Sequence, residues 1–178
     1  MLGHRGDATG PAPYPGRMPS RVPAPVRLSA LLAAVALATT ACSGRTATVE
    51  SAPDAADPAC APAMIAMPDE LADLPLRPTD SQATAVWGDP AAVVLRCGVP
   101  SPGPTTDPCL RVDEVDWVVR DEDANWRLTT YGRTPAVEVL FAKDRASSDS
   151  VMTGLSSAVA RIPAERACVN LEDATPVG

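Results

Sequence analysis

Histidine is almost absent from this chain of 178 residues, and lysine and aromatic side chains are scarce. The single histidine is His4 and the single lysine is Lys143, while three Trp, two Tyr and one Phe are the aromatic residues. Without a histidine beyond position 4, Ser-His-Asp and Cys-His catalysis and histidine-ligated zinc or copper are excluded. We therefore expect no enzyme activity and no cofactor or metal.

Acidic residues outnumber basic ones by 22 to 15. Residues 1–42 hold four of the basic residues but only one of the acidic ones, so the rest of the chain has a net charge near −10, from 11 basic and 21 acidic residues. A surface this acidic repels phosphate backbones and anionic lipid headgroups. We therefore expect no nucleic-acid partner, and we expect any membrane association to depend on a lipid anchor.

An apolar run at residues 28–38 follows a stretch that contains arginines and precedes small residues. This order is typical of a secretory signal peptide, and the run is shorter than the roughly 20 residues that span a bilayer. We predict that residues 1–41 are a signal peptide. Met18 offers a more conventional start, so we also predict that residues 1–17 reflect the choice of start site.

The small residues end in Ala41-Cys42, which resembles the lipobox of bacterial lipoproteins, where the cysteine is acylated before cleavage. Thr39 departs from the leucine-type residue that is usual there. We predict that Cys42 is lipidated and anchors the protein on the extracytoplasmic face of the cell membrane. The alternative is cleavage near Ala41, which would leave a secreted soluble protein.

The chain beyond Cys42 divides by composition. Small, polar and proline residues fill positions 43–59, so residues 42–59 are predicted to be the lipidated cysteine and a flexible linker. Residues 60–168 are predicted to be a single disulfide-stapled domain, and residues 169–178 a C-terminal tail.

Hydrophobic periodicity within the domain predicts helices at both ends and strands between them. Pro68 separates helical patterns at 60–67 and 69–74, and an amphipathic pattern at 148–162 predicts the last helix. The predicted fold class is α+β: a four-stranded antiparallel sheet with N- and C-terminal helices packed on one face, in the order α-β-β-β-β-α. The four predicted strands are residues 93–99, 112–120, 125–131 and 136–141, with hairpin turns at 121–124 and 132–135.

Alternation along these strands separates an apolar face from a charged one. The apolar face is predicted to hold Val115, Trp117, Val119, Trp126, Leu128, Thr130, Val137, Val139 and Phe141. The charged face is predicted to hold Glu114, Asp116, Arg120, Arg127, Glu138 and Arg96. There we expect the arginines to pair across strands with Glu114 and Asp116, as a solvated face whose ion pairs each add little stability.

Four cysteines beyond Cys42 predict two disulfides in an exported domain. Three pairings are possible. We favour Cys97–Cys109, which would close a proline-rich loop, and Cys60–Cys168, which would join the two ends of the domain. Metal binding by the four thiolates is the less favoured alternative, because no CxxC pair is present.

Four sequence blocks occur in a characteristic succession: WGDP at 87–90, VLRCGV at 94–99, VDW at 115–117 and TTYGRTPAVEV at 129–139. In this order they resemble the actinobacterial exported proteins and lipoproteins grouped as domain of unknown function 3515. The resemblance covers residues 60–163. It implies export and supports the domain boundaries, but it implies no catalytic residue, ligand or partner.

The candidate site residues are Trp87, Arg96 and Arg133. Trp87 lies beside a tight turn and is predicted either to fill the end of the sheet or to stack on a sugar ring, while Arg133 lies at a hairpin tip where it could bind a carboxylate or phosphate. We expect any binding site to lie where these three side chains converge. The function predicted from the sequence is a lipid-anchored accessory protein of the envelope that binds another envelope protein. The alternative is a small ligand-binding protein or a carboxylate-based hydrolase.

Overall fold

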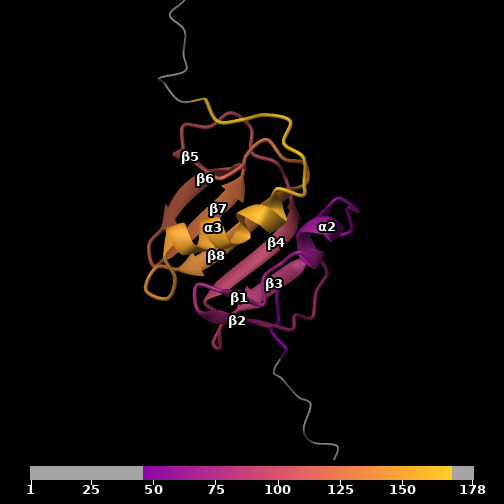
Figure 1. Ribbon diagram of the computed structural model, residues 1–178, viewed down its shortest axis with the longest axis vertical. Helices are drawn as coiled ribbons and strands as arrows, with labels where there is room; N and C mark the ends of the chain where they lie inside the picture. Colours follow the sequence, from indigo (N-terminus) through magenta and orange to yellow (C-terminus); the bar gives the residue numbers. More distant parts are fainter. Residues whose placement is uncertain (1–45, 170–178) are drawn as a thin grey trace, which may run out of the picture. The chain divides into compact units, whose positions relative to one another are not determined.

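The computed structural model describes residues 46–169, and eight strands in this part of the chain form one antiparallel sheet. The strands lie in the order β1-β2-β3-β4-β8-β7-β6-β5, and two short helices accompany them (Figure 1). In chain order the elements are α2 (Cys60–Ile65), β1 (Glu70–Leu71), β2 (Leu74–Arg77), β3 (Thr84–Trp87), β4 (Val93–Val99), β5 (Cys109–Val112), β6 (Val115–Glu122), β7 (Asn125–Thr130), β8 (Ala136–Ala142) and α3 (Ser148–Val159).

The fold is mostly β, so the prediction of a four-stranded sheet with N- and C-terminal helices on one face is wrong. Three predicted strands are confirmed as β4, β7 and β8, and both predicted hairpin turns join paired strands. The strand predicted at 112–120 is two strands, β5 and β6. The chain reverses between them at Asp113, whose φ of +53° lies in the left-handed region.

The prediction failed most in the half of the sheet that comes first in the chain. Residues 69–74, predicted to be helical, form the β1–β2 hairpin, in which Ala72 and Asp73 have φ values of 51° and 61°. Two consecutive left-handed residues make a tight hairpin turn and cannot belong to an α-helix. Strand β3 has no alternating pattern in its sequence because all four of its residues are buried.

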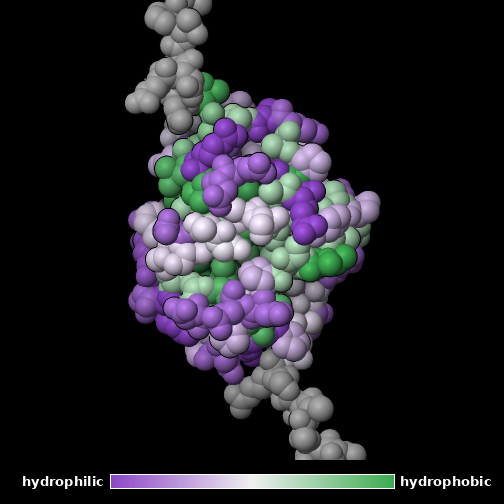
Figure 2. Space-filling model, viewed as in Figure 1, coloured by the Kyte–Doolittle hydropathy of each residue, from purple (hydrophilic) through white to green (hydrophobic). Residues whose placement is uncertain are grey.

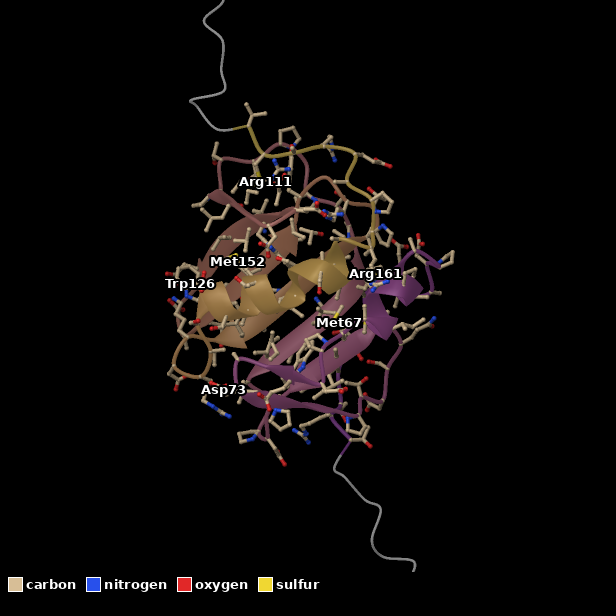
Figure 3. All side chains as sticks on the ribbon, in the orientation of Figure 1. Met67, Asp73, Arg111, Trp126, Met152 and Arg161 are labelled. Atoms are coloured by element: carbon tan, nitrogen blue, oxygen red, sulfur yellow. A yellow bond between two sulfur atoms is a disulfide. The ribbon has the colours of Figure 1, made fainter. Side chains whose placement is uncertain are left out.

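Helix α3 crosses one face of the sheet, which we call the inner face (Figure 1). The helix begins after Ser147, whose hydroxyl accepts a hydrogen bond from the Ser150 amide at 3.1 Å. Its apolar side packs on the inward residues of the sheet, and each fully buried Leu or Val contributes about 1.5–3 kcal/mol. Met152 on α3 belongs to this core and Met67 packs against it. Figure 3 labels both residues.

Few large apolar side chains remain exposed in the described part of the chain. They are Ile65 in α2, Leu110 in β5 and Val169 near the end of the described residues. Figure 2, drawn from the α3 side, shows strongly hydrophobic surface at the position of α2. The three residues belong to separate segments, so they do not by themselves define an interface.

Two disulfides fasten the fold. Cys60 in α2 is bonded to Cys97 in β4, and Cys109 in β5 is bonded to Cys168. The prediction of two disulfides is confirmed, but the predicted pairs Cys97–Cys109 and Cys60–Cys168 are wrong. Cys97 points to the inner face beside α2, and three strands separate β4 from β5 in the sheet.

Residues 47–55, which we call the N-terminal segment, pack on the sheet although they were predicted to belong to a flexible linker at 42–59. The Ala47 amide donates to the Pro78 carbonyl at 2.8 Å, and the Asp54 amide donates to the Gly98 carbonyl at 3.0 Å. Gly98 has a φ of +102°, and a Cβ there would lie 2.4 Å from the carbonyl carbon of Asp54. Small side chains, with Ala52 and Ala55 buried, permit this approach without any apolar periodicity in the sequence.

Several predictions concern residues outside 46–169: the signal peptide at 1–41, the start at Met18, the lipidation of Cys42, and all of the tail except Val169. Within residues 46–169, neither helix has the length and apolar character that crossing a membrane requires.

Candidate functional site

The face of the sheet opposite α3, which we call the outer face, carries a polar groove of about 700 Å³. Strands β4, β8, β7 and β6 form its floor, and the N-terminal segment and the loop after β4 form its walls. The strand register places Arg96 opposite Glu138 and Glu138 opposite Thr129. Side chains at paired positions of an antiparallel sheet point to the same face, so these three line the floor together.

Glu138 is the centre of an ion-pair network on this floor. Arg96 donates to one carboxylate oxygen of Glu138, from Nε at 3.0 Å and from Nη2 at 2.6 Å. Arg127 places its Nη1 2.6 Å from the other oxygen, and it also forms a bidentate pair with Glu122 at 2.6 and 3.0 Å. The arrangement links four side chains from four neighbouring strands.

The network differs from ordinary surface ion pairs because its central members are mostly covered. The side chains of Arg96 and Glu138 are 27% and 14% exposed. The hydrogen bond between Arg127 and Glu122 raises the pKa of the guanidinium above its ordinary value and lowers the pKa of the carboxyl. Both groups therefore stay charged throughout the neutral range, and the floor keeps a fixed pattern of charge.

Arg120 stands at the rim of the groove, where its Nε donates to Asp107 at 2.7 Å and lowers the pKa of that carboxyl. A second hollow of about 280 Å³ adjoins the groove. The two share Glu50 and the trio of Arg96, Arg127 and Glu138. The ion-pair network thus lies between two hollows on the outer face.

The three residues that the sequence singled out do not converge. Only Arg96 lines the groove. Trp87 is fully buried in the core on the inner face, where its indole N–H donates to the Pro68 carbonyl at 3.0 Å. Of the two roles predicted for Trp87, a buried packing role at the end of a strand is confirmed, and stacking on a sugar from an exposed position is wrong.

Arg133 is buried rather than exposed at a hairpin tip. It is 3% exposed and donates to the carbonyl oxygens of Ile162 and of Glu114, the latter at 2.6 Å. Burial lowers the pKa of its guanidinium. Because Arg133 binds main-chain carbonyls, it holds the segment after α3 in place and is not available to a ligand.

Asp116 likewise serves the fold. Its carboxylate lies 3.0 Å from the Arg111 guanidinium and accepts the Cys168 amide at 3.1 Å. The predicted pairing of Glu114 and Asp116 with Arg96, Arg120 and Arg127 is therefore wrong. Residues 46–169 contain no group of three or more His, Cys, Asp or Glu side chains that could hold a metal ion.

Sequence reasoning placed Arg96, Arg120, Arg127 and Glu138 on one charged face, and this is confirmed. Of the four it named only Arg96 as a site residue, because alternation reveals the face but not the strand register that joins Arg96 to Glu138. Glu50 and the wall that it belongs to were missed entirely, since a segment of small and polar residues carries no periodic signal.

Comparison with known protein families matches residues 22–167 to the family described as "Protein of unknown function (DUF3515)". No curated protein and no solved structure matches the chain.

Proposed function

The chain belongs to the DUF3515 family, whose description assigns no activity, and from its site we propose that it is an exported, lipid-anchored binding protein of the cell envelope that recognises its partner or ligand in the outer-face groove. The observation that carries this proposal is the groove itself. Four strands and the N-terminal segment form a hollow around fixed charges. Its volume of about 700 Å³ is within the size range of ligand sites.

Export is supported by two independent features. The order of arginines, apolar run and small residues before Cys42 is that of a signal peptide, and the domain contains two disulfides, which persist in oxidising compartments.

The position of the N-terminal segment bears on where an anchored domain would lie. Four residues, 43–46, separate Cys42 from Ala47, the first buried residue of the described chain. Even fully extended, this connection spans about 17 Å. A lipid on Cys42 would therefore hold the domain directly above the membrane. Glu50, in the groove wall, comes only a few residues after this anchor in the chain.

Binding is favoured over hydrolysis. Both oxygens of the Glu138 carboxylate accept hydrogen bonds or ion pairs from arginines, so neither is placed to take a proton from water. Asp116, the other well-buried carboxylate, is bound to Arg111 and lies outside the groove.

The proposal is tested by site-specific photocrosslinking in living cells. A photoreactive amino acid at Thr129, in the groove, should capture a defined envelope component, whereas the same amino acid at the exposed Arg145 should not. Equal capture from both positions, or none from Thr129, would reject the groove as the binding site.

The anchor is tested separately by cell fractionation. Cys42→Ala should move the protein from the membrane to the medium, and retention of this variant in the membrane would contradict lipid anchoring at Cys42.

A further inference from the structure

The hydrogen-bonding groups of the groove are unequally used. Arg96 donates hydrogen bonds from Nε and Nη2 to Glu138, while its Nη1 has no acceptor among the described residues. The hydroxyl of Thr129 has no hydrogen-bond partner in residues 46–169 either, and Arg120 uses only Nε. The open positions on the floor are therefore mainly donors.

The acceptors on the floor are already occupied. Glu138 receives Arg96 on one oxygen and Arg127 on the other. The remaining carboxylate of the lining, Glu50, lies on the wall and is exposed. Arg127 and Arg120 are in turn paired with Glu122 and Asp107, so carboxylates already match the charges of these two arginines. The groups left to bind a ligand are the open guanidinium edge of Arg96 and the Thr129 hydroxyl.

The surroundings of these open donors are apolar. The wall formed by the loop after β4 presents Val99, Pro100 and Pro102, and prolines offer no amide donor. On the other side of the network, the second hollow is lined in part by Val94 and Leu140. Any molecule that reaches the guanidinium groups will also contact apolar surface.

We propose that the groove binds an amphiphilic oxyanion, a carboxylate or phosphate attached to an apolar chain, with the anionic group held by Arg96 and Thr129 and the chain lying against the loop after β4. Guanidinium groups bind both oxyanions through charge-assisted hydrogen bonds, which are stronger than neutral ones. This inference rests on the proposed function in that it assigns a ligand class to the same groove.

Two sources can present this chemistry near the groove: an anionic lipid in the membrane and a free amphiphilic anion. Eight residue steps separate Cys42 from Glu50, a reach of about 28 Å at full extension, so a lipid headgroup is within range of an anchored domain.

The experiment uses the full exported protein in phosphatidylcholine nanodiscs, with hexanoate and hexyl phosphate as probes and hexanol as the uncharged control. Titration followed by NMR should show saturable binding of both anions, a shift of the Arg96 side-chain signals, and no such response to hexanol. Arg96→Gln should weaken anion binding at least about tenfold, since it removes a charged donor.

Two further variants test whether the affinity for anions depends on the charge of the groove. Glu50→Gln removes a negative charge from the wall and should strengthen anion binding two- to threefold. Arg145→Gln lowers the net charge by one, as Arg96→Gln does, but at an exposed position outside the groove, and should leave the affinity within twofold. If Arg96→Gln lowers the melting temperature, Thr129→Val replaces it as the test, because it removes a donor without breaking an ion pair.

The two sources are separated by adding phosphatidylglycerol to the nanodiscs. Competition with hexyl phosphate assigns the ligand to the membrane, and no competition assigns it to a free anion.

The inference is overturned if hexanol binds as well as hexanoate, or if neither Arg96→Gln nor Thr129→Val changes the affinity. Photocrosslinking from Thr129 without anion binding would overturn this inference and leave the proposed function standing. If the protein binds the anions but Cys42→Ala does not release it from the membrane, the inference stands and lipid anchoring at Cys42 is contradicted.

Discussion

Gly132 and Arg166 approach each other so closely that a Cβ on the glycine would lie 1.9 Å from the Arg166 carbonyl oxygen. Gly132 has a φ of +71°, and its own carbonyl accepts the Glu165 amide at 2.7 Å. The turn between β7 and β8 therefore holds the segment that follows α3, and it requires a residue without a side chain.

Gly132→Ala should lower the free energy of unfolding by at least about 2 kcal/mol, because it combines a strained backbone with a steric clash. Urea denaturation measures the effect. Gly103→Ala is the matched control: a Cβ there meets nothing within 4 Å, so stability should stay within about 0.5 kcal/mol of the parent. Similar effects of the two substitutions would contradict the close approach.

Arg133→Met should destabilise the domain by about 2–4 kcal/mol. The substitution keeps the apolar stem but removes the donors that satisfy the Ile162 and Glu114 carbonyl groups. Arg145→Met, at an exposed position, serves as the control in the same thermal and urea unfolding measurements. A melting temperature equal to that of the control would show that Arg133 is not needed to hold the segment after α3.

The two disulfides should differ in their resistance to reductant. Cys60 and Cys97 are 2% and 0% exposed, whereas Cys109 and Cys168 are half-buried. Limited reduction followed by alkylation and mass spectrometry should therefore label Cys109 and Cys168 first. Labelling of Cys60 and Cys97 at the same rate would contradict the difference in access.

Replacing both cysteines of either disulfide with serine should cost about 4 kcal/mol, since the bonds close loops with sequence separations of 37 and 59 residues. Chemical denaturation of the two double variants checks this value. The predicted but incorrect pair offers a control, because a Cys97→Ser, Cys109→Ser variant should lose both disulfides and be less stable than either.

The attachment of the N-terminal segment should weaken in acid. The Asp80 carboxylate accepts the Val49 amide at 3.1 Å, and this hydrogen bond, followed by one from Thr48, lowers the pKa of Asp80 below its ordinary 3.8. A carboxyl whose pKa is lower in the folded state stabilises that state above its unfolded pKa, and loses this effect as the pH falls through the folded value.

Amide exchange at Val49 should therefore accelerate below pH 3.8, relative to core amides such as that of Val139. Asp80→Ala, which removes the acceptor, should make exchange at Val49 fast relative to Val139 already at neutral pH, and should remove the pH dependence of this ratio. An unchanged ratio of exchange rates between Val49 and Val139 across this range would count against the role of Asp80.

The regular part of the fold could be predicted from sequence where one physical signal dominates. In β4, β7 and β8, alternation of apolar and charged residues follows directly from one buried and one open face, so Leu95 and Arg96 fall on the correct sides. The α3 pattern succeeded for the same reason, since its stripe of apolar residues contacts a single surface.

Where several contacts decide the structure together, sequence patterns failed. Ala72 and Asp73 have no turn signal as strong as Asn-Gly, yet their left-handed conformation converts a helix-like segment into a hairpin. The disulfide pairing depends on strand order, which places three strands between Cys97 and Cys109. The groove wall depends on Gly98 accepting the close approach of Asp54, a relationship that neither residue reveals alone.

The bond between Cys60 and Cys97 has a mechanical consequence if the domain is anchored through its N-terminus, as we propose. A pull applied from the membrane side would reach the contacts of Ala47 and Val49 first, and these are hydrogen bonds that separate one at a time. Detachment of the N-terminal segment would stop at Cys60, because the disulfide to Cys97 transmits the force to β4 in the centre of the sheet. Tension would thus strip the wall from the groove while leaving the barrier to unfolding of the core intact, so the site is the part of the molecule that yields to force.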